Sequence, residues 1–474
     1  MYTERRYWDP KIETMSLEEL RILQERRLKR KVEFVYANSA HFRRKFDEIG
    51  LLPGDIRDLE DINKIPLTNK NDLREGVVRA MSAGKKVFSE FLTVPERDIR
   101  TIHATSGTTG VPFTVPYTEL EMTSRGFIAT GDFLARAYWA AGLRYGDVLG
   151  HLWNLGGAMV GGGNHIIAKG ACGPEYYMTM VPCHVGRTAQ ILKVLKDVGA
   201  SGFTSTPSYA LYIPEYAESI GIDVRDLKLK AIFCAGEPGP ASIPGVRERL
   251  EEAWGARVFD TYGAPSAVVP YECEFHTGFH IQADINIIQI VDPETKKELP
   301  PGEYGSIVGT TVYEYNEAFP WLRFDTEDRG ALIGEPCPCG RTHPRIASVP
   351  GRWDDMVKIK GFQLHPNAVE RVIGESKGCS SEFLIIVDKD EDGKDRVSIR
   401  IEHEPDLGNL EQLRENLQHS IRTVITLKAN VEMVPKGTLG RFVMKKQRIV
   451  DLRTKEARDK FEQSVRLRSA EYFD

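Results

Sequence analysis

The sequence has little of what would mark an exported, membrane-spanning or nucleic-acid-binding protein. Its 474 residues include only seven cysteines, a sparse and odd number that argues against a disulfide framework. No apolar run approaches the length needed to span a bilayer, and the start, MYTERRYWDPKIE, lacks an apolar signal core. The formal net charge of -5 offers no basic surface for nucleic acid. We therefore expect a cytoplasmic globular protein without nucleic-acid or membrane partners.

Residues 105–110, Thr-Ser-Gly-Thr-Thr-Gly, concentrate four hydroxyls and two glycines directly after a short apolar run. Glycine lets the backbone approach a ligand closely, and consecutive amide and hydroxyl donors suit an anionic polyphosphate. Clusters of serine, threonine and glycine are also common in surface turns. The hexamer alone leaves a phosphate-binding loop and an ordinary turn as alternatives.

Between about residues 145 and 262 the sequence alternates between strand and helix patterns. We expect strands at 202–206, 230–235 and 257–261, and helices near 188–198, 208–219 and 242–253. Strands separated by helices pair in parallel through right-handed crossovers, so the expected fold class is α/β. Such sheets bind ligands beyond the carboxyl ends of their strands. Residues 235–238 and 262–263, each directly after an expected strand, are therefore candidate site residues.

Other patterns describe the two ends and the middle of the chain. We expect an N-terminal helix from the capping box SLEE at 16–19, β structure at 284–334, a hairpin around residues 392–393 and an amphipathic helix at 409–424. The composition changes to a compact α+β pattern in the last quarter. We expect a large N-terminal domain at 1–353 and a small C-terminal domain at 354–474.

Three further motifs accompany the glycine-rich loop: Ile-His-Ala at 102–104, TPSYAL at 206–211 and GRWDDMVK at 351–358. Together, and in this order, they resemble the phenylacetate–coenzyme A ligase branch of the adenylate-forming enzymes over nearly the whole chain. The resemblance implies a large N-terminal domain with mostly parallel sheets and a β-rich segment, followed by a small mobile α+β domain. It also implies an ATP-dependent, AMP-forming ligase that converts an aryl or arylacetic acid to its coenzyme A thioester through an acyl-adenylate.

The resemblance implies a nucleotide site. In the family the glycine-rich loop grips the ATP phosphates, the segment at 235–238 and Tyr262 frame the adenine, and Asp328 holds the ribose hydroxyls. Taken alone, Tyr262 is better explained as a core aromatic and Asp328 as a turn residue; their order in the chain is what favours the nucleotide site. The expected ATP- and AMP-binding residues are Ser106, Gly107, Thr108, Thr109, Gly110, Ala235, Gly236, Glu237, Pro238, Asp260, Thr261, Tyr262, Gly263, Asp328 and Arg352.

The resemblance also assigns roles in the last third of the chain. By register with the family's closing motif, Lys445 is the expected catalytic lysine, which caps the reacting carboxylate and the α-phosphate. Its neighbour Lys446 is the alternative, and a solvated basic run is a third interpretation. Asp354 is the expected hinge between the two domains.

An apolar pocket for the ring of the acid is expected after the strand pattern DVLGHLW. Its expected lining residues are Trp153, Asn154, Tyr209 and Ala264. Aromatic and aliphatic residues after a strand also occur as plain core, which is the alternative interpretation.

The sequence departs from the family pattern at three positions. Val111 stands where a loop lysine is usual, Ser266 where a glutamate commonly helps to hold magnesium, and Glu327 where a glycine is usual. Backbone amides still provide phosphate donors, whereas the missing glutamate matters more because Mg²⁺ prefers carboxylate and phosphate oxygens. Either Glu272 or Glu237, the latter through water, replaces it, or ATP itself holds most of the Mg²⁺. Loss of catalysis is a further alternative.

Cys273, His280, Cys337 and Cys339 form two fragments, C-x6-H and C-x-C, about sixty residues apart. Three cysteines and a histidine are a common ligand set for structural zinc, although C-x-C is less typical than C-x-x-C. The two cysteines in CPCGR also resemble a zinc site of this branch of the family. Structural Zn²⁺ is favoured over buried free cysteines, with His276 as the alternative nitrogen ligand.

Two other functions stay open at the level of sequence. One keeps adenylation and transfers the acyl group to an acceptor other than coenzyme A, such as an amine or a carrier-protein thiol. The other is a nucleotide-binding homologue without catalysis, an alternative that rests on Val111 and Ser266. A homodimer is possible, since members of the family are often dimers.

Overall fold

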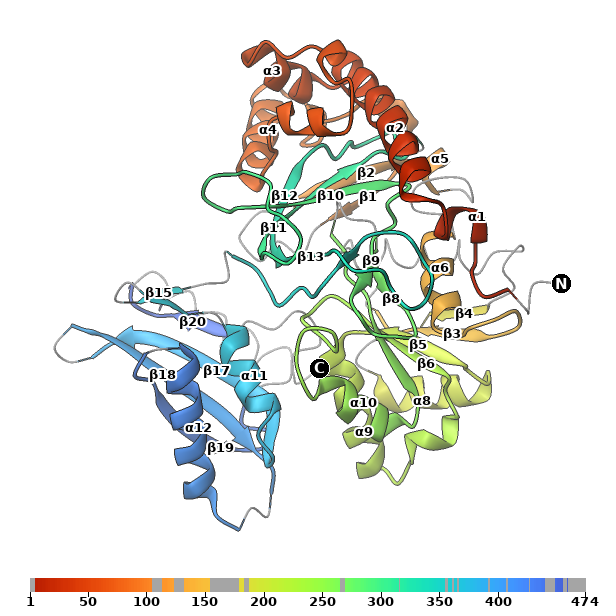
Figure 1. Ribbon diagram of the computed structural model, residues 1–474. Coiled ribbons are helices and arrows are strands. Elements are labelled where there is room, and N and C mark those ends of the chain that lie inside the picture. Colours follow the sequence, from red (N-terminus) through yellow and green to blue (C-terminus); the bar gives the residue numbers. More distant parts are fainter. Residues whose placement is uncertain are drawn as a thin grey trace. The chain divides into compact units, whose positions relative to one another are not determined.

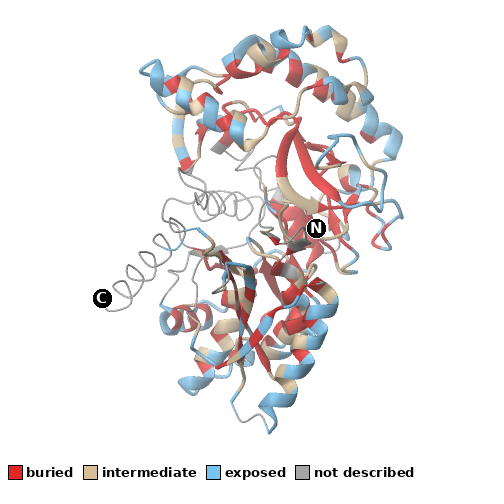
Figure 2. Ribbon diagram, turned by 90° about the vertical axis from the view of Figure 1, so that its left-hand side faces the viewer, coloured by how far each residue is buried: buried red, intermediate tan, exposed pale blue. Residues whose placement is uncertain are grey.

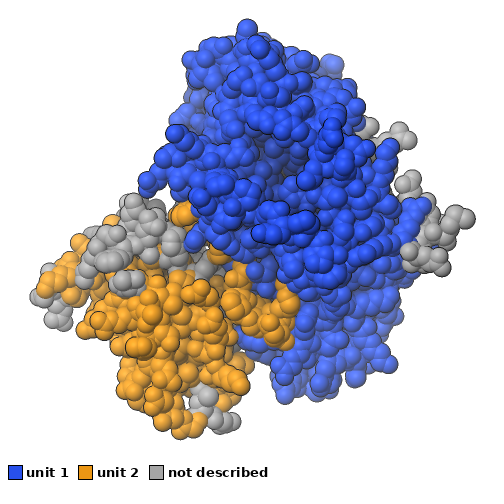
Figure 3. Space-filling model, in the orientation of Figure 1, with its two compact units in different colours: residues 1–241, 249–349 blue, residues 242–248, 350–474 orange. Residues whose placement is uncertain are grey.

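A computed structural model of the chain is shown in Figure 1. It describes all residues except 1–4, 105–112, 123–131, 154–178, 183–186, 265–268, 315, 354–356, 360–361, 365, 391–392, 406–407, 426, 440–447, 455–457 and 459–474. The chain divides into two compact units, residues 1–241 with 249–349, and residues 242–248 with 350–474 (Figure 3). The expected domains 1–353 and 354–474 do not anticipate the assignment of residues 242–248 to the second unit.

The first unit begins with helices that cover its β-rich part. They are α1 (Pro10–Glu13), α2 (Leu17–Asn38), α3 (Ala40–Glu48) and α4 (Lys70–Ser82), with 3₁₀ turns at Pro53–Asp55, Glu60–Lys64 and Glu96–Asp98. The predicted capping box is confirmed, because Glu19 N–H donates to Ser16 Oγ at 3.2 Å and Ser16 N–H donates to Glu19 Oε2 at 3.1 Å. Leu28 and Val32, one turn apart on α2, are fully buried against Phe46 of α3.

A parallel sheet forms the part of the first unit that carries the expected motifs. Its strands are β3 (Val148–His151), β4 (Thr179–Pro182), β5 (Gly202–Ser205), β6 (Ala231–Cys234) and β7 (Arg257–Asp260), in the order β4-β3-β5-β6-β7. The three strands expected from the sequence are confirmed, and the neighbouring pairs are parallel. Strands β5 and β6 are buried along their whole length. Figure 2 shows that buried residues gather on the inner strands and exposed residues on the outer helices. Gly202 is required in β5, because a Cβ there would lie 2.3 Å from the carbonyl oxygen of Ala231 in β6.

Helices connect and cover these strands (Figure 1). They are α6 (Asp132–Ala140), α8 (Thr188–Asp197), α9 (Pro207–Ser219) and α10 (Val246–Trp254), with a 3₁₀ turn at Val224–Leu227. Trp254 packs edge-on against Phe203 of β5, with ring centroids 4.8 Å apart. The helix expected from residue 242 begins only at Val246, because Gly245 has φ +78, a left-handed conformation that a helix excludes. None of the helices within the described ranges is both long and apolar enough to cross a bilayer.

Antiparallel strands complete the first unit. They are β1 (Ile99–Ala104), β2 (Thr114–Thr118), β8 (Tyr271–Glu272), β9 (Phe279–His280), β10 (Asn286–Val291), β11 (Gly305–Thr311), β12 (Phe324–Gly330), β13 (Leu332–Ile333) and β14 (Arg345–Ile346), and helix α5 (Glu119–Met122) follows β2. Strands β10, β11 and β12 form one sheet, which confirms the expected β-rich segment. Strands β1 and β2 pair with each other on either side of residues 105–112.

The second unit is an α+β domain, as expected. Its elements are β15 (Val357–Ile359), β16 (Phe362–Leu364), α11 (Pro366–Gly374), β17 (Cys379–Lys389), β18 (Asp395–His403), α12 (Leu410–Ile425), β19 (Asn430–Pro435) and β20 (Ile449–Asp451). The predicted hairpin is confirmed as β17 and β18, and the predicted amphipathic helix as α12. Residues 242–248 join this unit through close packing, since a Cβ on Gly374 would lie 2.9 Å from the carbonyl oxygen of Pro244.

Candidate functional site

Several expected motifs begin where parallel strands end. Thr206 follows β5, Ala235 follows β6 and Thr261 follows β7. Because the carboxyl ends of parallel strands meet at one edge of a sheet, these motifs share the edge at which such sheets bind ligands.

Glu237 and Ser208 connect two of these motifs. The Glu237 carboxylate accepts a hydrogen bond from Ser208 Oγ at 3.0 Å and another from the Ser208 N–H at 3.3 Å. Thr206 Oγ1 caps α9 by accepting from the Tyr209 N–H at 3.2 Å. A half-buried carboxylate is therefore fixed at the edge of the sheet by the first turn of α9.

Tyr262 and Asp328 are 66 residues apart in the sequence and meet directly in the structure. The tyrosine hydroxyl donates to Asp328 Oδ2 at 2.6 Å. Burial, together with the adjacent Asp328 charge, raises the pKa of Tyr262 well above its usual value, so the hydroxyl keeps its proton. Asp328 lies in β12, so its interpretation as a turn residue is wrong. Two residues expected to contact different parts of one nucleoside are thus neighbours.

Asp260 and Thr261 order the loops at the same edge. Asp260, 3% exposed, accepts from the Ala241 N–H at 3.0 Å, and Thr261 Oγ1 donates to the Cys234 carbonyl at 3.0 Å. The Asp260 carboxylate also explains Gly239, because a Cβ there would lie 2.8 Å from Asp260 Oδ2. These two side chains fix the loop that carries residues 235–238.

The expected acid-pocket residues differ in their surroundings. Trp153 is 7% exposed, and its indole N–H donates to Thr204 Oγ1 at 2.9 Å. Tyr209 is buried with its hydroxyl 3.0 Å from Thr188 Oγ1 at the start of α8. Ala264 packs, partly buried, beside the cluster that includes Tyr262. The structure thus places Trp153 at the sheet edge and directs the Tyr209 hydroxyl toward α8.

Other expected site residues lie outside the described ranges. They are Ser106, Gly107, Thr108, Thr109, Gly110, Asn154, Asp354 and Lys445, together with Val111, Ser266 and Lys446. Arg352 is described and belongs to the second unit.

Cys273, His280, Cys337 and Cys339 converge at a second place in the first unit. One potential ligand atom from each of these buried residues lies within 4.8 Å of the others. Cys273 Sγ is 3.6 Å from Cys337 Sγ, and Cys339 Sγ is 3.4 Å from His280 Nε2. The hydrogen bond between Cys273 and Cys339, together with the nearby His280, lowers the pKa of Cys339 and raises that of Cys273, so one thiolate of this pair is favoured.

His276, the alternative zinc ligand, and Glu272, a candidate magnesium ligand, lie beside this cluster and contact other residues. His276 Nε2 is 3.3 Å from Arg257 Nη2, and its ring lies against Phe259 at 5.0 Å between centroids. Glu272 is 1% exposed and accepts from the Asp260 N–H at 2.7 Å. Among the residues that the structure describes, His276 is therefore not part of the Cys/His cluster.

The N-terminal segment, residues 5–15, packs on the loop that carries Cys337 and Cys339. Tyr7 donates its hydroxyl proton to the Cys339 carbonyl at 2.9 Å. Arg341 and Glu13 form a 2.6 Å ion pair in which the side chains are 2% and 1% exposed. His343 Nε2 lies 2.9 Å from the Ile12 carbonyl. Contacts across more than 300 residues of sequence thus enclose the cluster.

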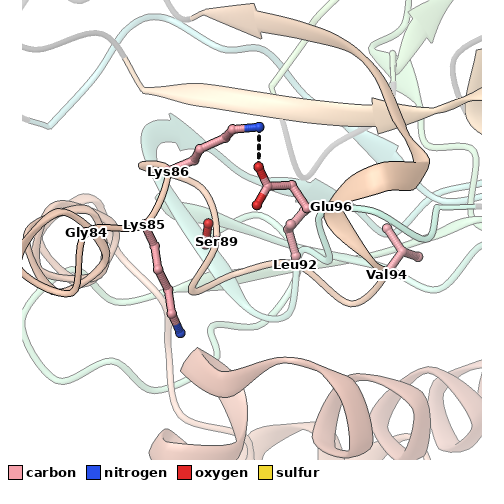
Figure 4. A pocket seen from close by; sticks show the side chains of 7 residues that line it. All are labelled: Gly84, Lys85, Lys86, Ser89, Leu92, Val94 and Glu96. Atoms are coloured by element: carbon pink, nitrogen blue, oxygen red, sulfur yellow. Dashed lines mark ion pairs between the residues drawn. The ribbon is translucent and has the colours of Figure 1, made fainter.

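A cavity of about 540 Å³ lies elsewhere in the first unit (Figure 4). It is lined by residues between Gly84 and Glu96, and Lys86 forms an ion pair with Glu96 across it (Figure 4). None of the expected site residues that the structure describes lines it, so we do not assign it to the reaction.

Sequence reasoning missed several residues that support the site. Ser208, Thr204 and His151 bond to motif residues or to each other, and Glu13 and Arg341 hold the cluster loop. Ser208 lies within TPSYAL, so its motif position was a usable signal. The other four carry no local pattern that distinguishes them from ordinary core residues.

Two family patterns match the chain. The pattern described as AMP-binding enzyme matches residues 56–311, and the pattern described as AMP-binding enzyme C-terminal domain matches residues 361–453. The fold agrees: the crystal structure of 2-hydroxyisobutyryl-CoA ligase in the postadenylation state, in complex with R3-HIB-AMP, has a TM-score of 0.84 at 27% identity, and the match covers 98% of this chain and 95% of that one. Fold and patterns together define an adenylate-forming enzyme.

Curated relatives show which family of adenylate-forming enzymes the chain resembles. Phenylacetate-coenzyme A ligase of Thermus thermophilus is 33% identical over 468 residues, covering 94% of this chain and 99% of the relative. The Escherichia coli enzyme of the same name is 31% identical, covering 94% of this chain and 97% of the relative. The chain therefore belongs to the phenylacetate–coenzyme A ligase family. Its reaction class is the ATP-dependent, AMP-forming ligation of a carboxylic acid to coenzyme A.

Proposed function

We propose that the acid is an aryl or arylacetic acid, and that it is activated at the carboxyl edge of the parallel sheet. The observation that carries the proposal is the meeting of Tyr262 and Asp328 beside the loops that follow β6 and β7. In this site adenine lies against Tyr262 and residues 235–238, and the ribose hydroxyls bond to Asp328. The names of the curated relatives support an arylacetic acid.

In the first step the carboxylate attacks the α-phosphate of ATP, pyrophosphate leaves, and an acyl-adenylate remains. Residues 106–110 hold the phosphates through backbone amides and hydroxyls. Lys445 stabilises the negative charge that gathers between the carboxylate and the α-phosphate.

Magnesium accompanies ATP in this proposal, and two carboxylates are candidates to hold it. Glu237 is half-buried at the sheet edge, whereas Glu272 is 1% exposed and already accepts from the Asp260 N–H. Mg²⁺ keeps several water ligands, so an accessible carboxylate suits it better than an enclosed one. We therefore favour Glu237, through water, over Glu272.

In the second step the coenzyme A thiol displaces AMP from the acyl-adenylate and gives the thioester. The first step is a substitution at the α-phosphorus and the second a substitution at the acyl carbon. They need different groups around the same bound acid, so the small domain changes orientation between them. Asp354 is the proposed hinge, and Arg352 contacts the ribose or phosphates. A crystal structure of 2-hydroxyisobutyryl-CoA ligase with 2-HIB-AMP and CoA in the thioesterification state, 28% identical with a TM-score of 0.68, supports this second state.

The Cys/His cluster is proposed to hold structural Zn²⁺. Zinc–sulfur bonds of 2.3 Å at tetrahedral angles separate two ligand sulfurs by about 3.8 Å, close to the 3.6 Å between Cys273 and Cys337. His280 directs Nε2 to the cluster, 3.4 Å from Cys339 Sγ, so this is the imidazole nitrogen that would bind the metal. Three sulfurs and one imidazole are a closed set, which would hold loops together and leave no position for substrate.

The experiment is a screen of carboxylic acids for ATP-dependent pyrophosphate release, with and without coenzyme A. Phenylacetate and related aryl acids should release pyrophosphate, and coenzyme A should convert the adenylate to a thioester. Release without thioester formation would indicate another acceptor, and ATP binding without release would indicate a non-catalytic homologue. We propose a cytoplasmic enzyme, where reducing conditions keep the cluster thiols available for zinc, and a homodimer, which sedimentation would test.

A further inference from the structure

His151, Thr204 and Trp153 form a chain of hydrogen bonds at the carboxyl edge of the parallel sheet. The Trp153 indole N–H donates to Thr204 Oγ1 at 2.9 Å, and Thr204 Oγ1 lies 3.1 Å from His151 Nδ1. The three residues are 1%, 7% and 7% exposed, in the order named. Buried polar groups at this depth need partners, so the three side chains hold one another in place.

The order of the bonds follows from what each group can do. An indole N–H only donates, so Thr204 Oγ1 is the acceptor from Trp153. Thr204 Oγ1 and His151 Nδ1 share a second hydrogen bond, whose donor depends on the histidine tautomer. Thr204 therefore fixes the orientation of the indole.

The other end of the Trp153 ring contacts a loop of the nucleotide site. A Cβ built on Gly236 would lie 3.3 Å from Trp153 Cη2 and 3.4 Å from Cζ3, so the ring already fills the space beside that glycine. Gly236 has φ +81, and it follows β6 within residues 235–238. The indole thus extends from strand β5 to the loop after β6, with a hydrogen bond at its N–H end and an apolar contact at the other.

We propose that Thr204 is a positioning residue that selects for aromatic acids by holding Trp153 as a fixed wall of the acid pocket. The inference rests on the proposed function and names a determinant of its specificity. A rigid aromatic face suits a flat aryl or arylacetic ring through stacking or edge contacts. Without the hydroxyl the buried indole N–H has no acceptor and the ring leaves its position. The loss falls on the acid, because the contact with Gly236 is made by the apolar edge of the ring.

The test compares Thr204→Val, which removes the hydroxyl at nearly equal volume, with Thr204→Ser, which keeps it. Initial rates of pyrophosphate release are measured with phenylacetate, or with the acid that the parental enzyme uses best. Thr204→Val should raise the KM for the acid by about 10-fold or more, with the KM for ATP within about 3-fold. Thr204→Ser should stay within about 3-fold of the parental KM for the acid.

Trp153→Phe removes the same hydrogen bond from the other side and closes a double-mutant cycle. If the bond carries the effect, adding Thr204→Val to Trp153→Phe should change the KM for the acid by less than about 2-fold. Trp153→Phe also tests the inference alone if Thr204→Val does not fold, and melting curves report folding.

The inference would be overturned if folded Thr204→Val had the same KM for the acid as the parental enzyme, or if the two substitutions were fully additive. Either result would leave the proposed function intact. Absence of pyrophosphate release from the parental protein with every acid would overturn the proposed function and, with it, this inference.

Discussion

The Cys/His cluster and the edge of the parallel sheet are both built from distant parts of the sequence, but they are built differently. At the cluster, four buried side chains direct their donor atoms to one point within 4.8 Å. At the sheet edge the described motif residues bond to each other, as Glu237 does to Ser208 and Tyr262 to Asp328. The first arrangement has room for a single ion between its donors, and the second leaves its loops available to larger ligands.

This difference indicates separate tasks. If the four donors beside the buried Arg341–Glu13 ion pair hold the proposed zinc, the site stabilises the fold, because metal and chain order each other. A sheet edge lined by loops can admit ATP, an acid and coenzyme A in turn. We expect damage at the cluster to appear first in stability, and damage at the edge to appear first in rate or KM.

The largest effect is expected at the cluster. Cys337→Ser should abolish zinc binding and lower the free energy of unfolding by on the order of 5 kcal/mol, since structural zinc contributes folding energy directly. Metal analysis and denaturant melts measure both quantities. A buried cysteine outside the cluster, Cys379→Ser, is the control for the loss of a thiol. The metal hypothesis would be contradicted if purified parental protein contained no zinc, or if Cys337→Ser were as stable as the parent.

At the active site the largest effect is expected from Lys445→Ala. Removal of a preorganised electrostatic contact costs on the order of 10²–10³ in rate, and Val111 cannot supply the charge. Pyrophosphate release should fall by this factor, with ATP binding retained and the melting curve unchanged. Lys446→Ala is the control: if it alone loses activity, the register is wrong by one residue. If neither substitution lowers the rate of pyrophosphate release, both lysines are solvated surface charges.

A pH effect is expected from His343, which connects the N-terminal segment to the cluster loop. Burial lowers the pKa of His343 to about 4, against about 6.5 in an unfolded chain, so the unfolded chain takes up this proton first. Stability is therefore lost as pH falls from about 6.5 to about 4, by about 3 kcal/mol. Denaturant melts across this range measure it. His343→Gln should flatten the pH dependence, whereas the exposed His419→Gln should not; identical curves for both would contradict the assignment.

The smallest effect is expected from Tyr262→Phe. It removes one hydrogen bond to Asp328 and should raise the KM for ATP by about 10-fold, while zinc content and melting change little. Steady-state kinetics with ATP as the varied substrate measure it. Tyr216→Phe, on α9, is the matched control. If Tyr262→Phe left the KM for ATP unchanged, the Tyr262 hydroxyl would have no part in nucleotide binding.

Much of the fold follows from local signals in the sequence. The capping box at Ser16 starts α2, and the short apolar runs between amphipathic segments form parallel strands β5, β6 and β7. The start of α10 was predicted too early, because the periodicity extends across Gly245, whose left-handed backbone excludes it from the helix. The assignment of residues 242–248 to the second unit depends on tertiary packing that no periodicity encodes.

The site residues also divide into those that the sequence could predict and those that only tertiary packing reveals. Cys273 and Cys339 were identified because ligand chemistry restricts residue type, and the structure brings them together. Thr204 could not be identified, because its role depends on the indole of Trp153, just after the neighbouring strand β3, rather than on its own neighbours in sequence. The pairing of Glu13 with Arg341 was equally hidden, since 328 residues separate them and each is an ordinary charged residue until it is buried.

The central claim is that ATP and the acid meet at the sheet edge. The most direct measurement is a crystal structure with a non-hydrolysable phenylacetyl-adenylate analogue. We expect the adenine beside Tyr262 and residues 235–238, the ribose hydroxyls on Asp328, and the aromatic ring against Trp153. An analogue bound at the cavity beside Lys86 and Glu96, or in an orientation without contact to Tyr262 and Asp328, would contradict the account.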